Sequence, residues 1–266
     1  MPGDEPPENI SGGESGGGQA STFTTDEAAT RAEEVVDRLG ERYWQKAYGG
    51  RDAFECLVRT ILSQNTSDVA SQPAHDSLMD RYGDGGGLVE ALAEADQQRL
   101  AETISSAGLY NQKSERIIAI AEEIRAEYGS EAAFDTFVRE GDPGDVRRAL
   151  LEYNGVGPKT ADCVLLFAGG RDGVFPVDTH VHRIARRIGL APPGADHEAV
   201  REYLERDIPA EKCGFGHTAM IQFGREYCSA RKPACLDDPE ACPMADICEQ
   251  VGVDPETGVV VDPKDV

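Results

Sequence analysis

The run Leu151-Glu152-Tyr153-Asn154-Gly155-Val156-Gly157-Pro158-Lys159-Thr160-Ala161 carries the strongest structural signal in the chain. A helix is expected to end before the glycines, which allow a tight turn, and Pro158 suits the first turn of a second helix. Backbone N–H groups at glycines can approach an anion, and the positive end of a helix dipole favours phosphate. The run therefore predicts a helix-hairpin-helix in which Gly155, Val156 and Gly157 bind a phosphate. For an isolated Gly-x-Gly, a simple interhelical turn is the commoner interpretation.

Apolar residues recur at helical spacing elsewhere along the chain. Phe54, Leu57 and Ile61 follow the i, i+3, i+7 pattern, and the segment from Ile117 to Tyr128 repeats it before Gly129. Val174 to Val177 is the only short extended run, and no hairpin turn such as Asn-Gly joins alternating strands. The sequence therefore predicts an all-α fold.

The charge of the chain is strongly acidic. Among 266 residues, 49 are Asp or Glu and 26 are Lys or Arg, which gives a formal net charge of -23. At ordinary ionic strength this charge repels phosphates and argues against nucleic acid as a partner. In molar salt the Debye length is about 3 Å, so only local basic contacts count. The composition resembles that of halophile proteins, and the lack of a signal peptide or apolar span predicts a high-salt cytoplasm.

Four of the seven cysteines share a short C-terminal segment with the spacing C-x6-C-x6-C-x5-C. Four thiolates suit an iron-sulfur cluster or a structural zinc ion, and the spacing alone does not separate the two. These candidate ligands are Cys228, Cys235, Cys242 and Cys248. The others, Cys56, Cys163 and Cys213, are interpreted as buried thiols.

Several segments together resemble one family. LEYNGVGPKTADCVL (151–165), followed by VFPVDTHVHR (174–183), resembles the hairpin and downstream aspartate of the endonuclease III family of helix-hairpin-helix DNA glycosylases. Residues 61–68, 107–113 and 228–235 resemble three further family segments, so the resemblance spans roughly residues 25–250. It implies a base-excision repair enzyme that acts on duplex DNA as a monomer.

The resemblance assigns catalytic roles to Lys159 and Asp178. An amine can attack the sugar C1′, expel the damaged base and hold the product as a Schiff base, and a carboxylate can stabilise the positive charge that develops on the sugar. Family members that only remove the base lack this lysine, so Lys159 implies lyase activity. The alternatives are that Lys159 is a phosphate-binding cation at a helix start and that Asp178 is the N-cap of a helix from Thr179 to Leu190.

The family also extrudes the damaged nucleotide, since a base inside a duplex is out of reach. Leu109 falls where the family inserts an apolar wedge, and Gln64 or Asn65 where it inserts an amide; the gap-free match favours Asn65. Arg231 and Lys232 fall in a loop that touches the DNA backbone. Further backbone contacts are expected from three arginines of one helix: Arg183, Arg186 and Arg187.

The cysteine spacing departs from the family pattern, C-x6-C-x2-C-x5-C. This chain has four extra residues in the second gap, around Asp237-Asp238-Pro239-Glu240. An acidic turn of this kind can loop outward without moving the ligands. The resemblance therefore favours a [4Fe-4S] cluster over zinc.

We expect two helical domains with a DNA-binding cleft between them. Residues 47–172 form a helical barrel with the hairpin, residues 23–46 and 173–250 form a domain with the cluster, and residues 1–22 and 251–266 are a disordered and a loosely held tail. The implied function is removal of oxidised pyrimidines from duplex DNA in the nucleoid, followed by β-elimination. The alternatives are a mismatch-directed (T or U opposite G) glycosylase of the same superfamily and a non-catalytic DNA-binding module.

Overall fold

The computed structural model describes residues 8–10, 23–45, 51–83 and 86–266. The chain divides into two compact units, one made of residues 1–48 and 172–266 and the other of residues 49–171. Within the described residues, regular strand is limited to four two-residue segments, so the predicted all-α fold is confirmed. No described helix combines the length and apolar character that a membrane span requires.

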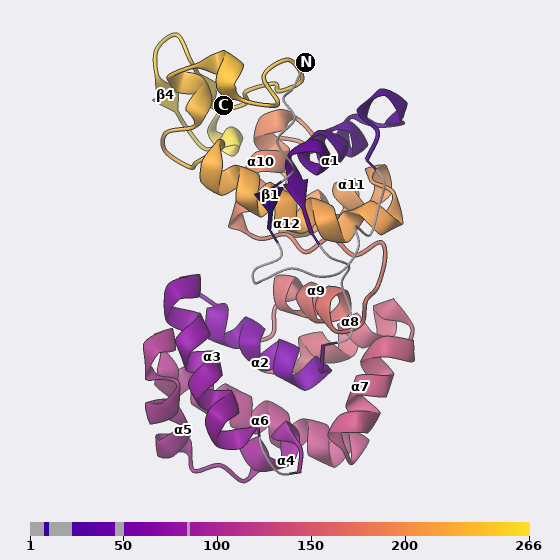
Figure 1. Cartoon of the computed structure of the whole chain (residues 1–266), viewed down its shortest axis with the longest axis vertical. Helices are drawn as coiled ribbons and strands as arrows, with labels where there is room; N and C mark the ends of the chain where they lie inside the picture. The colour runs from indigo at the N-terminus through magenta and orange to yellow at the C-terminus, as the bar shows by residue number, and fades with distance from the viewer. Residues whose placement is uncertain (1–7, 11–22, 46–50, 84–85) are drawn as a thin grey trace. The chain divides into compact units, whose positions relative to one another are not determined.

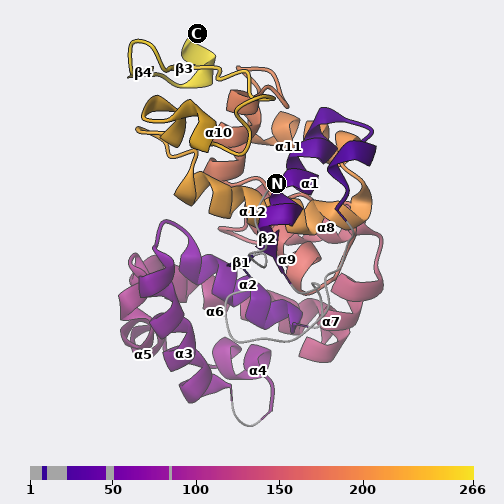
Figure 2. The same ribbon diagram turned by 45° about the horizontal axis from the view of Figure 1, so that its top comes forward.

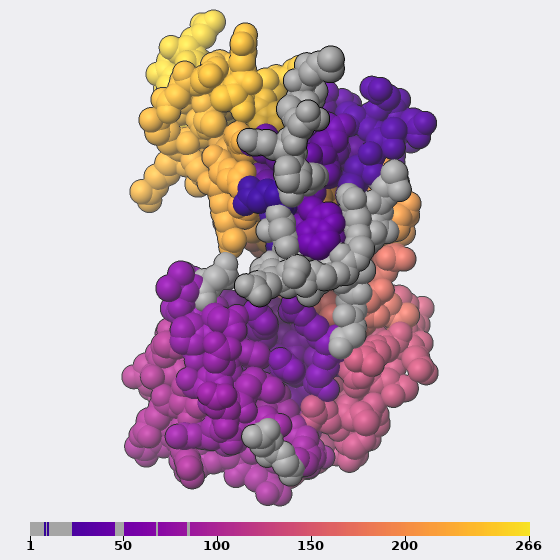
Figure 3. Space-filling view, viewed as in Figure 1, coloured from indigo at the N-terminus to yellow at the C-terminus, as the bar shows by residue number. Residues whose placement is uncertain are grey.

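The unit of residues 49–171 is built around the apolar helix α2 (Figure 1). Figure 3 shows the outer surface of this unit from the same side, coloured from violet to pink. Asp52 starts α2 by accepting the N–H groups of Phe54 and Glu55, and Leu57, Val58 and Leu62 of α2 are fully buried. The helices are α2 (Ala53–Ser63), α3 (Asp68–Tyr82), α4 (Leu88–Ala93), α5 (Gln97–Thr103), α6 (Tyr110–Tyr128), α7 (Glu131–Glu140), α8 (Pro143–Glu152) and α9 (Pro158–Phe167), with 3-10 turn η2 (Ser105–Ala107) before α6. The α2 helix contacts α3, α6, α7 and α9, so its C-terminal end reaches the hairpin between α8 and α9.

The other unit packs four helices around one apolar core (Figures 1 and 2). They are α1 (Arg31–Arg42), α10 (Thr179–Ile188), α11 (His197–Asp207) and α12 (Ala210–Glu226), and α1 and α10 each contact both α11 and α12. Val36, Ile184 and Phe223 are buried between them. Short 3-10 turns lie at Thr25–Glu27 (η1), Ala234–Leu236 (η3) and Pro239–Ala241 (η4).

The two ends of the chain differ from the expected tails where they are described. Strand β1 (Glu8–Asn9) pairs in parallel with β2 (Tyr43–Trp44), while most of the predicted disordered tail lies outside the described residues. Residues 251–266 hold an antiparallel hairpin of β3 (Val253–Asp254) and β4 (Val259–Val260), then the turn η5 (Pro263–Asp265). An ion pair of 2.9 Å between Asp262 Oδ1 and Arg186 Nη1 attaches this segment to α10, so it is held more firmly than expected.

Candidate active site

The hairpin between α8 and α9 has the backbone geometry that its glycines predict. Val156 N–H donates to Tyr153 O at 3.0 Å, and Gly155 has φ +87°, a left-handed conformation that side chains disfavour. A Cβ on Gly155 would also lie 2.6 Å from Cδ of Arg116, whereas one on Gly157 would meet nothing within 4 Å. Among the described residues, no acceptor takes the N–H of Gly155 or of Gly157. Both donors are therefore available to an anion.

Gln64, the residue that follows α2, is hydrogen-bonded to this hairpin. Its amide Nε2 donates to Gly155 O at 3.0 Å and to Thr160 Oγ1 at 3.1 Å. The side chain is half-buried in this position. The amide of Gln64 is therefore engaged inside the unit, while its neighbour Asn65 is exposed.

Lys159 is the second residue of α9 and is half-buried in the first turn of that helix. The next residues, Thr160 to Asp162, are buried, and Arg147 of α8 pairs with Asp162 through Nε and Oδ1 at 2.7 Å. This ion pair joins the two helices of the hairpin. It fixes the start of α9, and with it the backbone that carries Lys159, beside the available N–H groups.

Asp178 belongs to the other unit and is the N-cap of α10. Its Oδ1 accepts the N–H of Val181 at 2.8 Å, and the side chain is half-buried. The capping interpretation is therefore correct, and the helix runs from Thr179 to Ile188. Burial lowers the pKa of the nearby His180 below its usual value, although the Asp178 carboxylate opposes this effect. Near neutral pH, His180 is thus an uncharged neighbour of the carboxylate.

Leu109 and Asn65 lie on two loops of the unit of residues 49–171. Leu109 precedes α6 with its side chain 56% exposed, a large apolar surface to leave in water. Asn65 is also exposed, and both residues have positive φ, 47° for Leu109 and 52° for Asn65. The buried Lys113 lies beneath these loops and was missed as a functional candidate. Lys113 precedes Ile117 by four residues and so shares its buried helical face. A lysine at such an apolar position was the signal in the sequence that pointed to a buried ammonium.

The four C-terminal cysteines line one pocket. Its wall also includes Arg187 and apolar side chains, among them Phe223 and Tyr227. Two donors point at sulfur: Gln250 N–H at 3.4 Å from Cys248 Sγ, and Arg187 Nη1 at 3.6 Å from Cys228 Sγ. No three His, Cys, Asp or Glu side chains of the described chain stand close enough to share a single metal ion. The thiols thus surround a common space rather than meet at one point.

Burial shapes the chemistry of these thiols. It raises the pKa of Cys248 to about 11 and raises the pKa of Cys235 and Cys242 as well. Thiolates at these positions would therefore need the positive charge of a metal. The other three cysteines are buried, as predicted, and burial raises the pKa of Cys56 and Cys213 to about 12.

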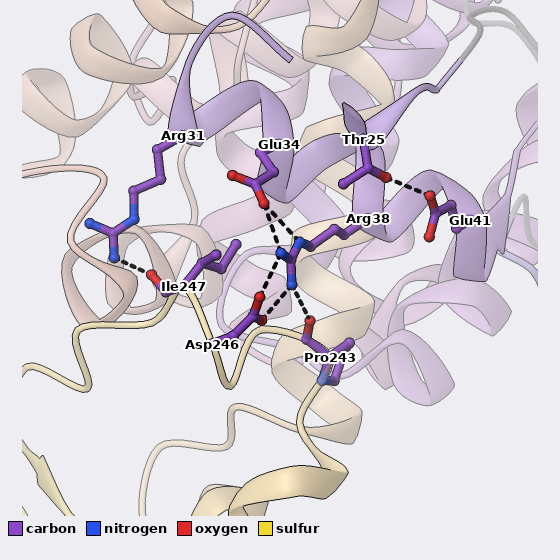
Figure 4. A network of polar contacts seen from close by, with 8 residues as sticks. All are labelled: Thr25, Arg31, Glu34, Arg38, Glu41, Pro243, Asp246 and Ile247. Atoms are coloured by element: carbon purple, nitrogen blue, oxygen red, sulfur yellow. Dashed lines mark hydrogen bonds and ion pairs between the residues drawn. The ribbon is translucent and has the colours of Figure 1, made fainter. Parts of the chain in front are cut away.

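Helix α1 holds the cysteine segment in place (Figure 4). The guanidinium of Arg38 donates to both carboxylate oxygens of Asp246, at 2.5 and 2.8 Å, and to Pro243 O at 3.3 Å. Arg31 donates to the carbonyl oxygens of Ile247 and Ile188. Because the contacts to residues 243, 246 and 247 fall between Cys242 and Cys248, the N-terminal helix positions the segment that bears the last two cysteines.

The inserted residues between Cys235 and Cys242 lie outside the pocket. Residues 237–241 are exposed, and Asp238 caps η4 by accepting Glu240 N–H at 3.1 Å. Arg231 and Lys232 are both exposed, and Lys232 Nζ pairs with Asp237 Oδ2 at 2.9 Å. The insertion therefore places an acid beside a candidate DNA-binding cation.

The arginines of α10 differ from the expectation of DNA-backbone contacts. Arg186 and Arg187 are only 4% and 3% exposed, and Arg187 donates to Ser229 O and Ala230 O, both at 2.7 Å. Arg183 donates through Nη2 to Cys228 O at 2.8 Å. The expectation is wrong for Arg186 and Arg187. Backbone carbonyls of the first cysteine loop engage Arg187, while Pro193 O and the Asp262 carboxylate engage Arg186.

The chain is similar to known proteins in sequence and in fold. Residues 58–210 match the family model described as HhH-GPD superfamily base excision DNA repair protein. The chain is 32% identical over 218 residues to endonuclease III of Thermotoga maritima, covering 82% of this chain and 90% of that one. It resembles a trapped endonuclease III–DNA covalent intermediate with TM-score 0.66 and 25% identity, over 86% of this chain and 97% of that one. A thermostable thymine-DNA glycosylase has the same fold, with TM-score 0.66 and 22% identity over 82% and 94% of the two chains.

Proposed function

The chain belongs to the endonuclease III family of base-excision DNA glycosylases with lyase activity, and we propose that it removes oxidised pyrimidines from duplex DNA and then cleaves the abasic strand. The observation that carries the proposal is Lys159 in the first turn of α9, directly after a hairpin with two available N–H donors. A phosphate bound there would hold the DNA backbone next to an amine.

In the proposed reaction, the neutral amine of Lys159 attacks C1′ of the damaged nucleotide. A bond forms between Nζ of Lys159 and C1′ as the glycosidic bond between C1′ and the base breaks. The base leaves with the electron pair of that bond and takes up a proton. Loss of the ring C1′–O bond gives a Schiff base. Removal of a C2′ proton then expels the 3′ phosphate, and water releases the lysine. Asp178 stabilises the positive charge that develops on the sugar.

The remaining contacts follow from the exposed groups of both units. Gly155 and Gly157 present backbone N–H groups to one phosphate, whereas the N–H of Val156, predicted to join them, is engaged by Tyr153 O. Leu109 is the wedge, and Asn65 fills the gap left by the extruded nucleotide. Gln64 acts indirectly by holding the hairpin. A basic pair on the first cysteine loop, Arg231 and Lys232, meets the DNA backbone.

We assign a [4Fe-4S] cluster to the four cysteines. These four thiols would hold the cluster, because they line a common pocket and N–H donors reach two of the sulfurs. A cluster would supply the positive charge that buried thiolates need and would order the loop of Arg231 and Lys232.

A mismatch-directed glycosylase is the second candidate, because a thymine-DNA glycosylase shares the fold. A non-catalytic binding module is the third. The presence in one chain of Lys159 after the hairpin and of a carboxylate at Asp178 favours the Schiff-base enzyme over both. All three functions predict DNA binding, so only a covalent assay separates them.

Borohydride trapping on abasic and thymine-glycol duplexes tests the proposal directly. The wild type should become covalently joined to both duplexes, Lys159→Ala to neither, and the control Lys264→Ala, at an exposed lysine, should behave like the wild type. Absence of a wild-type adduct would refute the lyase. A wild type that processes only T or U opposite G would establish the mismatch enzyme instead.

The capping and charge roles of Asp178 can be separated with two variants. Asn also caps helices well, so Asp178→Asn should keep the stability of the fold and lose base excision, while Asp178→Ala should lose both the activity and about 1 kcal/mol of stability. Thermal unfolding and single-turnover excision measure the two effects. Full excision by Asp178→Asn would show that the carboxylate only caps α10.

A further inference from the structure

Lys113 carries a buried ammonium between two loops. Its side chain is 2% exposed, and Nζ donates to Leu62 O at 2.8 Å, to Thr66 Oγ1 at 2.8 Å and to Ala107 O at 2.7 Å. These three acceptors match the three N–H groups of an ammonium. All three acceptors are uncharged, and no carboxylate of the described residues is among them. A buried cation without a counter-ion is costly, so its retention calls for a role beyond packing.

The two loops are those of the candidate wedge and gap-filling residues. Leu62 and Thr66 flank Asn65 at the end of α2, and Ala107 precedes Leu109 at the start of α6. Thr66 Oγ1 also donates to Ala107 O, so the lysine and the threonine join the loops at one point. Asn65 and Leu109 are two of the three non-glycine residues with positive φ in the described chain. Backbone conformations of this kind persist only where surrounding contacts impose them.

On the basis of the proposed function, we propose that Lys113 is a positioning residue for nucleotide extrusion. Its ammonium joins the loops of Asn65 and Leu109 and keeps both side chains at the surface in the conformation that enters DNA. The lysine itself touches neither DNA nor the reacting atoms. It keeps both loops in place before the duplex opens, so no loop ordering has to accompany extrusion.

This role distinguishes substrates by whether a base has to leave the stack. A thymine-glycol duplex requires unstacking of a base, whereas an abasic site has no base to extrude. Loss of the Lys113 contacts should therefore impair the first substrate much more than the second. Loss of general stability, or of Lys159 chemistry, would impair both.

The experiment uses the full chain and Lys113→Met, which keeps the length of the side chain and removes the charge. Lys264→Met makes the same change at an exposed position and is the control. A 2-aminopurine next to thymine glycol reports unstacking by its fluorescence. We expect Lys113→Met to lose this signal at saturating protein, and to lower single-turnover excision about tenfold to a hundredfold. Borohydride trapping on an abasic duplex should stay close to the wild type.

The outcomes separate this inference from the proposed function. A wild type that forms no adduct on the abasic duplex refutes the function. A wild-type adduct together with an unchanged 2-aminopurine signal in Lys113→Met overturns the role of Lys113, and so does equal impairment on both duplexes. If Lys113→Met does not fold, Thr66→Val decides in the same assays. This variant keeps the lysine and removes the hydrogen bonds that Thr66 Oγ1 makes with Lys113 Nζ and with Ala107 O.

Discussion

The hairpin makes a quantitative prediction from one chemical change at two positions. Gly155→Ala and Gly157→Ala each add one methyl group, two residues apart in the same turn. At Gly155, φ is +87° and the new Cβ would lie 2.6 Å from Cδ and 2.9 Å from Nε of Arg116. At Gly157, φ is -101° with ψ 175°, an extended conformation open to any residue, and no atom lies within 4 Å of the new Cβ.

The two substitutions should therefore affect different properties: Gly155→Ala the stability of the fold, and Gly157→Ala the affinity for DNA. Gly155→Ala forces a side chain into the left-handed region, which costs about 1–2 kcal/mol, and it also displaces Arg116. Gly157→Ala should stabilise the fold by about 0.4–1 kcal/mol, because alanine restricts the unfolded chain. Its methyl group, however, would take up part of the open space at the hairpin in which we expect the phosphate to bind. Loss of a hydrogen bond to a charged phosphate costs about 1.5–3 kcal/mol, or roughly tenfold to a hundredfold in affinity.

Urea unfolding followed by circular dichroism gives the stability of both variants. Fluorescence anisotropy with an abasic-analogue duplex, at one fixed salt concentration, gives their affinity. We expect Gly157→Ala to be at least as stable as the wild type and to bind DNA weakly. If it binds as tightly as the wild type, the Gly157 N–H does not contact a phosphate. If Gly155→Ala is as stable as the wild type, the argument from φ and Arg116 is wrong.

Three further predictions concern metal, pH and salt. Cys242→Ser should lose the broad visible absorbance and the bound iron of the purified protein, while Cys163→Ala should keep both; a colourless, zinc-loaded wild type would contradict the cluster. Burial lowers the pKa of Lys113 from 10.5 to about 8, so the folded state binds fewer protons than the unfolded state between these values. The unfolding free energy of the wild type, relative to Lys113→Met, should therefore rise with pH across that window; a constant difference in urea titrations would count against it. With a net charge of -23, affinity for an abasic-analogue duplex should hold or increase from about 0.1 to 1 M KCl, and a steep loss would exclude the high-salt hypothesis.

Sequence alone could predict the local features of the site. The hairpin depends on glycines and a proline a few residues apart, and the cap at Asp178 needs only the N–H of Val181, three residues later. Spacing likewise predicted that Cys56 is a buried thiol. Each of these features is decided by short-range backbone geometry or by helical period, and so it is visible in a short window of sequence.

Features that depend on distant partners were not predictable in this way. Arg187 looked like a surface arginine, but its acceptors are carbonyls 42 and 43 residues further along the chain. Gln64 finds its acceptors at Gly155 and Thr160, so nothing near it in sequence separates its role from that of Asn65. Residues 251–266 lack helical periodicity and contain Pro263, yet Pro263 is buried and Asp262 pairs with Arg186.

The acidity of the chain limits which contacts can hold DNA. A surface cation in such a chain is readily paired with an acid, as Lys232 is with Asp237, and buried cations such as Lys113 and Arg187 are engaged by carbonyl oxygens. Backbone N–H groups are different, because they carry no net charge for a carboxylate to neutralise and they release no counter-ions when they bind phosphate. The available N–H groups of the Gly155–Gly157 turn are therefore the phosphate contact that an excess of negative charge weakens least.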